Sequence, residues 1–345
     1  MPKSEKPVGV IGAGSFGTAI ANLLAHNTEV LLYSRKAEVV DTINRAHHHF
    51  GVAVSSRVKA TSDLEEVAKR CLLIFPVVPS ANFRRMMRDL APFLRPYHVM
   101  IHGTKGFDVN TAETDDATPL KREDVSTMSE VILQESSVAR VGCLAGPNLA
   151  TEIMEGLPTA TVIGSKFDEV FQLGKKALSS KQFHVFGSYD LLGAELAGAL
   201  KNIMAVGSGI LRGKGLGKNL QAMLLTRGLM EMVYFGKAMG ATTSAFFGTA
   251  GIGDLIATAT SKKSRNFTFG YRLGAGEKTN DILTTMPELP EGVRTLKMAV
   301  QLASYYKLRV PITQIIYNIV FKDFDIDKAI DFLMTYPYDV DVDFI

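Results

Sequence analysis

The stretch of sequence that decides the fold is Val8-Gly9-Val10-Ile11-Gly12-Ala13-Gly14-Ser15-Phe16-Gly17. Its first four residues have the apolar, β-branched character of a buried strand, and the residues that follow the stretch, 18–25, predict an apolar helix. Gly12, Gly14 and Gly17 form a GxGxxG motif between the two. A second apolar strand is predicted at residues 29–33, within the ~30 residues that a dinucleotide-binding unit spans.

Each glycine of this motif has a separate physical task. Gly12 allows a tight turn from strand to helix, Gly14 lets the backbone approach a pyrophosphate, and Gly17 lets the helix pack closely on the strand. The pyrophosphate then meets unpaired N–H groups at the positive end of the helix dipole. The alternative is a plain strand-to-helix turn. The context favours a Rossmann-like site for a dinucleotide.

The composition is that of an ordinary globular protein. With 345 residues, of which 46% are apolar, the chain is long enough for two domains of ~100–200 residues each. A formal charge of only +3 argues against binding to nucleic acid through phosphates. Two distant cysteines, Cys71 and Cys143, suggest neither a disulfide framework nor a zinc site. We find no secretory signal and no apolar run that could span a membrane, so we expect a cytoplasmic protein without a metal.

The chain changes character near residue 188. Before it, short apolar strands alternate with helical patterns, which favours a parallel sheet with helices on both faces. After it, long helical patterns predominate, at residues 191–212, 221–239, 294–306, 311–321 and 326–335. We therefore predict an α/β fold class with a Rossmann-like dinucleotide-binding domain over residues 1–188 and an all-helical substrate domain over residues 189–345. Residues 108–129 are predicted to form a long polar surface loop.

The residues after the second strand bear on the choice of dinucleotide. A strict NAD site has Asp or Glu there for the ribose 2′-hydroxyl, but this chain has Ser34-Arg35-Lys36. Arginine can stack on adenine and pair with a 2′-phosphate. We therefore predict that NADPH is accepted, with Arg35 as its contact. The alternative is that Arg35 is a solvated surface charge.

Three places in the helical half are candidates for chemistry. Lys201 comes late in an apolar helical pattern, so it either extends to solvent or serves a pocket in which desolvation lowers its pKa. Asp254 ends a glycine-rich turn and is either a helix N-cap or a site residue. Ser264-Arg265-Asn266 is either a solvated loop or a set of donors for a phosphate. Together they suit a phosphorylated carbonyl substrate.

The first half offers residues at the carboxyl ends of its strands, where ligands bind in open α/β sheets. Lys105 follows the strand that ends near Ile101, and Gly146-Pro147-Asn148 follows a later strand. By contrast, the run from His47 to His49 cannot share one face, so it is interpreted as a loop without a metal.

The order and spacing of seven segments resemble the NAD(P)-dependent glycerol-3-phosphate dehydrogenases, over roughly residues 8–333. The segments are Gly12 to Gly17, Thr104-Lys105-Gly106, Ala145-Gly146-Pro147, Leu200-Lys201-Asn202, Gly248 to Leu255, Ser264-Arg265-Asn266 and Glu291-Gly292. The resemblance implies reversible reduction of dihydroxyacetone phosphate to sn-glycerol 3-phosphate by NAD(P)H, which supplies glycerophospholipid synthesis.

The resemblance also implies roles for single residues. Lys201 would be the catalytic proton donor or acceptor. Substrate contacts would come from Lys105, Gly146, Asn148, Lys201, Asp254, Ser264, Arg265 and Asn266. Cofactor contacts would come from Gly12, Gly14, Ser15, Phe16, Gly17, Arg35, Lys105, Ala150, Arg265 and Glu291. Three features depart from the family pattern: Asn148 replaces the usual Ser or Thr, Pro76 is an extra proline, and the insertion at residues 108–127 is longer than usual.

Two other functions remain open at this point. One is a related two-domain dehydrogenase of the 3-hydroxyacid or 6-phosphogluconate type, against which the Ser264-Arg265-Asn266 cluster argues. The other is a non-catalytic NADP(H) sensor, which has no need of Lys201, Asp254 and Arg265 together. The long apolar helices also lead us to expect a homodimer.

Overall fold

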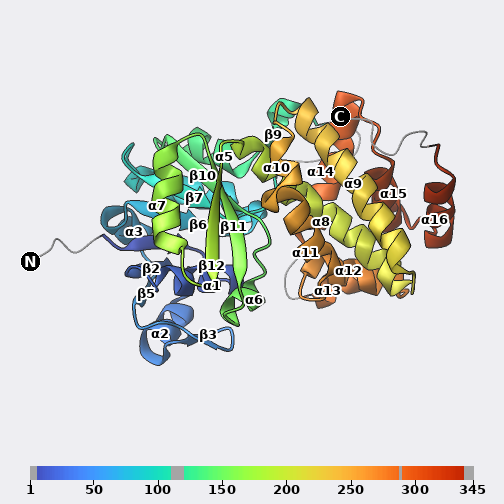
Figure 1. The fold of residues 1–345 in the computed structure, drawn as a ribbon. Coiled ribbons are helices and arrows are strands. Elements are labelled where there is room, and N and C mark those ends of the chain that lie inside the picture. Colours follow the sequence, from blue (N-terminus) through green and yellow to red (C-terminus); the bar gives the residue numbers. More distant parts are fainter. Residues whose placement is uncertain (1–5, 110–119, 287–289, 338–345) are drawn as a thin grey trace, which may run out of the picture. The chain divides into compact units, whose positions relative to one another are not determined.

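In the computed structural model, residues 6–109, 120–286 and 290–337 are described. Contacts divide the chain into two compact units. The first unit comprises Met1–Asp108 and Thr127–Leu191, and the second comprises Val109–Ser126 and Leu192–Ile345. Figure 1 shows the sheet of the first unit in blue to green and the helices of the second in yellow to red. The chain therefore passes between the units three times.

The first unit is built on an eight-stranded sheet with the order β12-β11-β10-β7-β6-β1-β2-β5. Its strands are β1 Val8–Ile11, β2 Val30–Tyr33, β5 Val58–Thr61, β6 Leu73–Pro76, β7 Val99–His102, β10 Arg140–Ala145, β11 Thr159–Ser165 and β12 Phe183–Ser188. The strand that precedes the glycine motif, β1, lies between β2 and β6 and is parallel to both. This arrangement brings the carboxyl ends of β1, β2, β6, β7 and β10 to one edge of the sheet, where a ligand is expected.

The sheet is mixed, so the prediction of a parallel sheet was wrong at one edge. β10 and β11 are antiparallel, with Gly142 opposite Ser165 and Ala145 opposite Val162. The connection between these strands contains only one short helix, and the chain re-enters the sheet from the end at which β10 left it. The last pair, β11 and β12, is parallel again.

Helices cover both faces of the sheet, as predicted. They are α1 Ser15–Leu24, α2 Ala37–Ala46, α3 Leu64–Arg70, α4 Ser80–Leu90, α5 Met128–Glu135, α6 Ala150–Met154 and α7 Asp168–Leu178. One apolar core joins the sheet to α1, α2, α6 and α7, and a second joins the other face to α3, α4 and α5. Because side chains of a strand alternate between faces, neighbours such as Val10 and Ile11 enter different cores.

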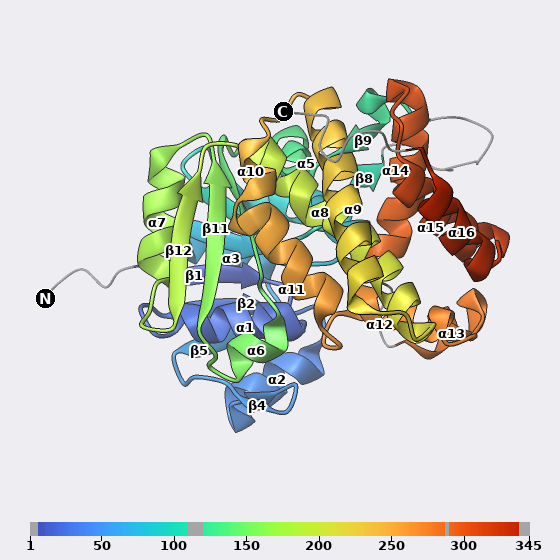
Figure 2. The same cartoon turned by 45° about the vertical axis from the view of Figure 1, so that its right-hand side comes forward.

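The second unit is mainly helical. Its helices are α8 Leu191–Gly213, which begins at the end of the first unit, α9 Lys218–Ala238, α10 Ser244–Phe247, α11 Asp254–Thr260, α12 Arg265–Gly274, α13 Thr279–Thr285, α14 Glu291–Tyr306, α15 Pro311–Lys322 and α16 Ile326–Thr335. The five helices predicted here are all present, with ends shifted by a few residues. Figure 2 shows the same helices from a second side.

α8 is the central element of the second unit. From Ala194 to Leu211 its residues are buried, apart from Glu195, which is partly exposed. Glycines let its neighbours approach closely: a Cβ added at Gly209 would lie 2.2 Å from the carbonyl oxygen of Phe267 in α12, and one added at Gly270 of α12 would lie 2.0 Å from that of Val206. The two helices therefore pack backbone against backbone.

The prediction of a polar surface loop over residues 108–129 was wrong for the part of it that the structure describes. Asp108–Val109 forms β8 and Val125–Ser126 forms β9, and these two strands pair. The capping box of Thr127 and Glu130 then starts α5, whose first residue, Met128, is buried in the core. Residues 110–119 lie outside the described part. Across the described residues, no helix is long and apolar enough to cross a membrane.

Candidate functional site

The glycine motif has the geometry that its spacing predicts. Gly12 has φ +116°, a conformation that L side chains rarely adopt. A Cβ added at Gly17 would lie 1.7 Å from the carbonyl oxygen of Gly12, so only glycine fits there. Gly14 is the N-cap of α1, and a Cβ built on it would meet no described atom within 4 Å. Open space therefore lies in front of the helix that begins with Ser15.

The start of α1 suits an anion. Its first turn has no acidic residue, and its N-cap makes no side-chain hydrogen bond. The first turn of the ten-residue helix α1 presents backbone N–H groups that have no partner within the helix, and the positive end of the helix dipole lies at the same point. The aromatic ring of Phe16 packs beside Gly103, since a Cβ there would lie 2.7 Å from Phe16 Cε1. These residues fit the pyrophosphate of a dinucleotide.

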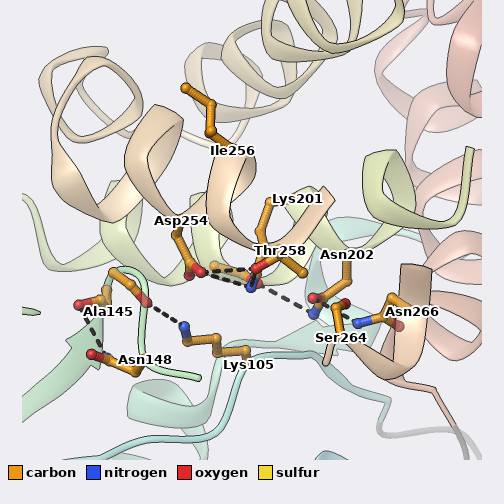
Figure 3. Close-up of polar contacts among 12 residues, drawn as sticks. Lys105, Ala145, Asn148, Lys201, Asn202, Asp254, Ile256, Thr258, Ser264 and Asn266 are labelled. Atoms are coloured by element: carbon orange, nitrogen blue, oxygen red, sulfur yellow. Dashed lines mark hydrogen bonds and ion pairs between the residues drawn. The ribbon is translucent and has the colours of Figure 1, made fainter. Parts of the chain in front are cut away.

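A second group lies at the carboxyl ends of β7 and β10, in the same unit. The Lys105 ammonium donates to the carbonyl oxygen of Gly146 at 2.8 Å, a contact drawn in Figure 3. Asn148 Nδ2 donates to Thr161 Oγ1 at 2.9 Å. Its Oδ1 is buried and has no partner among the described residues. An unpaired buried acceptor is costly in the free protein and indicates a place for a donor on a ligand. Ala150 follows as the first residue of α6.

In the chain, Arg35 and the run from His47 to His49 follow β2, which pairs with β1 on the side away from β6. Arg35 is exposed directly after β2. The prediction of a loop for the histidine run was wrong, because His48–His49 forms β3 and pairs with β4 Val52–Ala53. His49 Nε2 lies 3.1 Å from the carbonyl oxygen of Ala13, so the hairpin braces the glycine turn. Across the described residues, no three His, Cys, Asp or Glu side chains are grouped as metal ligands.

The second unit contains a buried cluster of a lysine, an aspartate and a threonine. Lys201 Nζ donates to Asp254 Oδ1 at 2.8 Å and to Thr258 Oγ1 at 2.5 Å, and Thr258 Oγ1 donates to Asp254 Oδ1 at 3.1 Å. Lys201 is 5% exposed and Asp254 1% exposed. Figure 3 shows the lysine reaching from α8 toward the first two turns of α11. The lysine therefore does not extend to bulk solvent.

Lys201 and Asp254 of this cluster were predicted from the sequence as site residues, whereas Thr258 was not. Asp254 is the first residue of α11, whose N-cap is Gly253, so the simple N-cap alternative is wrong. Thr258 is four residues further along the same helix and therefore lies on the same face. The spacing from Asp254 to Thr258 was the signal available, but threonines at this spacing are common. A buried ammonium held by a carboxylate and a hydroxyl can give or take a proton.

A chain of amide groups lies beside the lysine. Asn266 Nδ2 donates to Asn202 Oδ1 at 2.9 Å, and Asn266 Oδ1 accepts from the Gly292 backbone N–H at 2.8 Å. The chain joins α8, α12 and the start of α14, and Figure 3 shows its first bond. Since an amide carries two hydrogens, Asn266 can donate one more bond. Asn202 was not among the predicted site residues, although it directly follows Lys201.

Two charged residues lie at the first turns of these helices. Arg265 begins α12, where Ser264 is the N-cap and accepts from Phe267 N at 3.3 Å. Glu291 begins α14. Burial lowers the pKa of Arg265, and the carboxylate of Glu291 opposes that shift. The guanidinium remains a cation at neutral pH and can bind a phosphate through two parallel hydrogen bonds.

The predicted residues thus fall into two groups, each held within one unit. The first unit contains Gly12, Gly14, Ser15, Phe16, Gly17, Arg35, Lys105, Gly146, Asn148 and Ala150, and the second contains Lys201, Asp254, Ser264, Arg265, Asn266 and Glu291. The first group has the features of a nucleotide site. The second combines the buried Lys201 ammonium, which could give or take a proton, with the Arg265 guanidinium, which could bind an anion.

Comparison with protein families gives two matches that together span most of the chain. Residues 7–171 match the model of the N-terminus of NAD-dependent glycerol-3-phosphate dehydrogenase, and residues 190–331 match that of its C-terminus. Both groups of predicted residues fall inside these matches.

Individual relatives agree over nearly their whole length. The chain is 36% identical to the glycerol-3-phosphate dehydrogenase [NAD(P)+] of Pseudomonas aeruginosa, covering 99% of this chain and 98% of the relative. The enzyme of the same name from Staphylococcus epidermidis is also 36% identical, covering 95% and 98%. The crystal structure of glycerol-3-phosphate dehydrogenase from Coxiella burnetii has a TM-score of 0.86 at 30% identity, covering 96% of this chain and 99% of that one.

Proposed function

Because the chain belongs to the NAD-dependent glycerol-3-phosphate dehydrogenase family, we propose that it reduces dihydroxyacetone phosphate to sn-glycerol 3-phosphate with NAD(P)H, reversibly. The product is the backbone of glycerophospholipids, so the reaction supplies lipid synthesis. The observation that carries the proposal is the buried cluster of Lys201, Asp254 and Thr258 in a chain that also has a glycine cradle for a dinucleotide.

When bound, a nicotinamide dinucleotide would provide the hydride for reduction of the C2 carbonyl of the substrate. The residues of the chain that would hold it are Ser15 and Phe16 at the start of α1, together with Arg35, Lys105, Ala150, Arg265 and Glu291. The cradle of Gly12 and Gly17 supports this assignment, because a larger residue at either position would be strained or would clash with the turn. Hydride transfer leaves negative charge on the carbonyl oxygen, which needs a proton.

Lys201 is the residue that we assign as proton donor. Its ammonium gives one proton to the C2 oxygen during reduction and, as the neutral amine, takes one from the C2 hydroxyl during oxidation. Asp254 accepts a hydrogen bond from Lys201 Nζ and stabilises the charged form, and Thr258 fixes the direction of the side chain. Burial of the cluster, with Lys201 5% exposed, keeps bulk water from competing for that proton.

The substrate phosphate needs a cation and hydrogen-bond donors, and the substrate hydroxyl needs a hydrogen-bond partner. We assign the phosphate to Arg265, with Ser264 and Asn266 beside it as neutral donors. Lys105, Gly146 and Asn148 are assigned to the substrate as well, and the unpaired Oδ1 of Asn148 supports a contact with a substrate hydroxyl. Ser264 also caps α12, so its hydroxyl would donate to the substrate while accepting from the helix.

We also propose acceptance of NADPH through Arg35, a cytoplasmic location and a homodimer. Exposure of Arg35 directly after β2 supports the first. The long apolar helix α8 gives no argument for the dimer, because its apolar side chains are buried within one chain. Light scattering on the purified protein measures the assembly directly.

The test is steady-state turnover with a panel of carbonyl substrates. Dihydroxyacetone phosphate should oxidise NADPH or NADH at a kcat/KM far above that for unphosphorylated dihydroxyacetone or for keto forms of 3-hydroxyacids. Equal rates with and without the phosphate would contradict the assignment of Arg265. No turnover of dihydroxyacetone phosphate, with intact cofactor binding, would reject the proposed activity.

A further inference from the structure

A network of charged side chains lies behind the loop that carries Lys105. Arg84, in the second turn of α4, donates from Nε to Asp108 Oδ2 at 2.6 Å, from Nη2 to Gln134 Oε1 at 2.8 Å, and from Nη1 to Glu135 Oε1. The side chains of Arg84, Asp108 and Glu135 are 15%, 8% and 16% exposed. One guanidinium therefore joins three separate segments of the first unit: α4, the residues after β7, and the end of α5.

The segment that contains Lys105 is held at both ends. Upstream, Thr104 Oγ1 donates to the carbonyl oxygen of Val78 at 2.7 Å, which ties the segment to the end of β6. Downstream, Phe107 is 1% exposed and Asp108 bonds Arg84. Lys105 lies between these two anchors, and its ammonium reaches Gly146. The direction of the Lys105 side chain thus depends on where the backbone is fixed at Thr104 and at Asp108.

The electrostatics of the network favour a fixed geometry. Burial lowers the pKa of the Arg84 guanidinium, but its bonds to Asp108 and Glu135 outweigh burial and raise it. The bonds from Arg88 and Arg84 lower the pKa of Glu135. Two cations, Arg84 and Arg88, face two carboxylates, Asp108 and Glu135, so the charges of the cluster are balanced. A planar guanidinium with partners on Nε, Nη1 and Nη2 has little freedom to rotate.

We infer that Arg84 is a positioning residue for the reaction, which acts through Asp108 to hold Lys105 at the substrate and cofactor. This inference rests on the proposed function of Lys105. Arg84 itself is not assigned a contact with either ligand. The competing explanation is that the network only stabilises the packing of α4 on α5. The two explanations differ in whether the effect of Arg84 passes through Lys105.

The chain offers a matched control one turn further along α4. Arg88 donates to Glu135 from Nε at 3.0 Å and from Nη2 at 3.2 Å, and its side chain is 65% exposed. Among the described residues its side-chain hydrogen bonds and ion pair go to Glu135 alone and none reaches the Lys105 segment. Arg84→Met and Arg88→Met make the same substitution, keep an apolar stem, and each remove one partner of Glu135. Of the two substitutions, Arg84→Met is the one that removes the Arg84–Asp108 contact.

The experiment measures kcat, KM for dihydroxyacetone phosphate, the Kd of NADPH and the Tm for both variants and for Arg84→Lys. We expect Arg84→Met to lower kcat/KM by about 10- to 100-fold, because a misplacement of ~1 Å can cost up to ~10²-fold. Arg88→Met should keep the wild-type kcat/KM, and Arg84→Lys, which retains a cation for Asp108, should recover part of the loss. If Arg84→Met fails to fold, Asp108→Asn replaces it, since that variant keeps the shape of the side chain.

A double-mutant cycle with Lys105→Ala gives the decisive comparison. If Arg84 acts through Lys105, adding Arg84→Met to Lys105→Ala should cause no further loss of kcat/KM. A full additional loss in the double variant, or equal effects of Arg84→Met and Arg88→Met, would overturn the inference. Failure of the proposed activity looks different: the wild-type protein would not turn over dihydroxyacetone phosphate. In that case the same cycle on the Kd of NADPH still decides whether Arg84 acts through Lys105.

Discussion

Lys201 is a single cation held below the protein surface by two oxygen atoms, those of Asp254 and Thr258. Taking an ammonium out of water is costly, and its partners recover that cost only with good geometry. Removing the side chain of Asp254 or Thr258 takes one hydrogen bond from the buried Lys201 ammonium. At the scale of single residues, the position of the Lys201 ammonium therefore depends on the whole cluster, and a change to any of its three side chains affects the other two.

Thr258 tests this view of the cluster. Thr258→Val removes the hydroxyl while keeping the shape, so Lys201 loses one of its two described partners. Hydrogen bonds to charged groups contribute ~1.5–3 kcal/mol, and we expect kcat to fall about 10- to 100-fold. Thr258→Ser is the control because it keeps the hydroxyl, and it should retain most of the activity. Equal activity of the Val and Ser variants would show that the hydroxyl has no role.

Arg35 gives a second prediction at this scale. If its guanidinium binds the 2′-phosphate, Arg35→Asp should raise the Kd of NADPH by about 10- to 100-fold, since a charge-assisted bond is lost. The Kd of NADH should change less. Lys36→Asp, next in sequence and also exposed, is the matched control for charge alone. Titration of both nucleotides into the wild-type protein and the two variants measures the six dissociation constants. Equal binding of NADH and NADPH to the wild-type protein would contradict the assignment.

Sequence reasoning reached some of these residues and missed others for physical reasons. Lys201 was singled out because a cation late in an apolar helical pattern is conspicuous, and Arg265 because it lies in a dense local cluster of phosphate-type donors. Thr258, Asn202 and Arg84 could not be predicted, because each gains its importance from a partner on another helix. Lys201 and Thr258 are 57 positions apart, and Arg84 and Glu135 are 51 apart. No local pattern in the sequence reports such pairs.

At the scale of elements, the crossing of α8 and α12 fixes the position of Lys201 relative to Arg265, the cation to which we assign the substrate phosphate. α8 carries Lys201 and Asn202, and α12 carries Arg265 and Asn266. The helices can meet backbone to backbone because glycines lie at the contact on both sides, including Gly209 and Gly270. The sequence predicted α8 as a helix, but the position of the crossing depends on which glycines face each other.

Gly209→Ala tests the crossing. Its Cβ would lie 2.2 Å from the Phe267 carbonyl oxygen, so the helices must separate. Overpacking typically costs ~1–3 kcal/mol, which exceeds the gain of up to ~1 kcal/mol from placing alanine in a helix. We expect a lower Tm together with lower kcat/KM.

Gly207→Ala in the same helix is the control. Its Cβ would meet the ends of flexible side chains, Ile316 Cδ1 at 2.6 Å and Leu224 Cδ1 at 3.3 Å, which can move aside. The Tm and the kcat/KM of Gly207→Ala should therefore fall less than those of Gly209→Ala. A Gly209→Ala protein with wild-type Tm and activity would contradict the close crossing.

The junction of α9 and α15 contains a buried carboxylate. Glu231 accepts from Ile312 N at 2.6 Å, and from Thr313 N and Thr313 Oγ1 at 2.9 and 2.7 Å. Burial raises the pKa of Glu231 to about 7, although its bonds to Thr313 and Ile312 oppose the shift. The folded protein therefore binds a proton here more tightly than the unfolded chain does. This raised pKa links the free energy of unfolding to pH.

The sign of the linkage follows from the raised pKa. The contribution of Glu231 to stability is fully present below pH 4.5 and is lost as the pH rises toward about 7. At ~1.4 kcal/mol per pKa unit, the loss amounts to about 3 kcal/mol. We expect the Tm of Glu231→Gln, relative to wild type, to increase from pH 5 to pH 7.5 and then to level off.

Taking the difference in Tm between the wild-type protein and Glu231→Gln removes the pH dependence that other titratable groups contribute. Arg227, Lys307 and Arg309, which line the cavity beside Glu231, are present in both proteins, so their effects cancel in the difference. Thermal unfolding of the two proteins at several pH values measures that difference. A difference in Tm that stays constant over this range would contradict the raised pKa.

At the scale of the whole molecule, the family could be predicted because its motifs keep their order from Gly12 to Glu291. The assignment of residues 109–126 to the second unit could not, because it depends on contacts between segments far apart in the chain. The antiparallel β10–β11 pair was missed for a similar reason: both strands are apolar, and apolarity does not report strand direction. The proposed reaction needs a hydride, which a bound dinucleotide would supply, and a proton, which we assign to Lys201.

The most direct test of the proposed reaction is the rate of NADPH oxidation on addition of dihydroxyacetone phosphate, for the wild-type protein and for Lys201→Ala. The Kd of NADPH is measured for both proteins. Loss of an acid–base group typically lowers turnover by ~10²–10⁴-fold, and we predict a fall in kcat of this size with an unchanged Kd. A Lys201→Ala protein that reduces dihydroxyacetone phosphate at a near wild-type kcat would contradict the assignment of Lys201 as the proton donor.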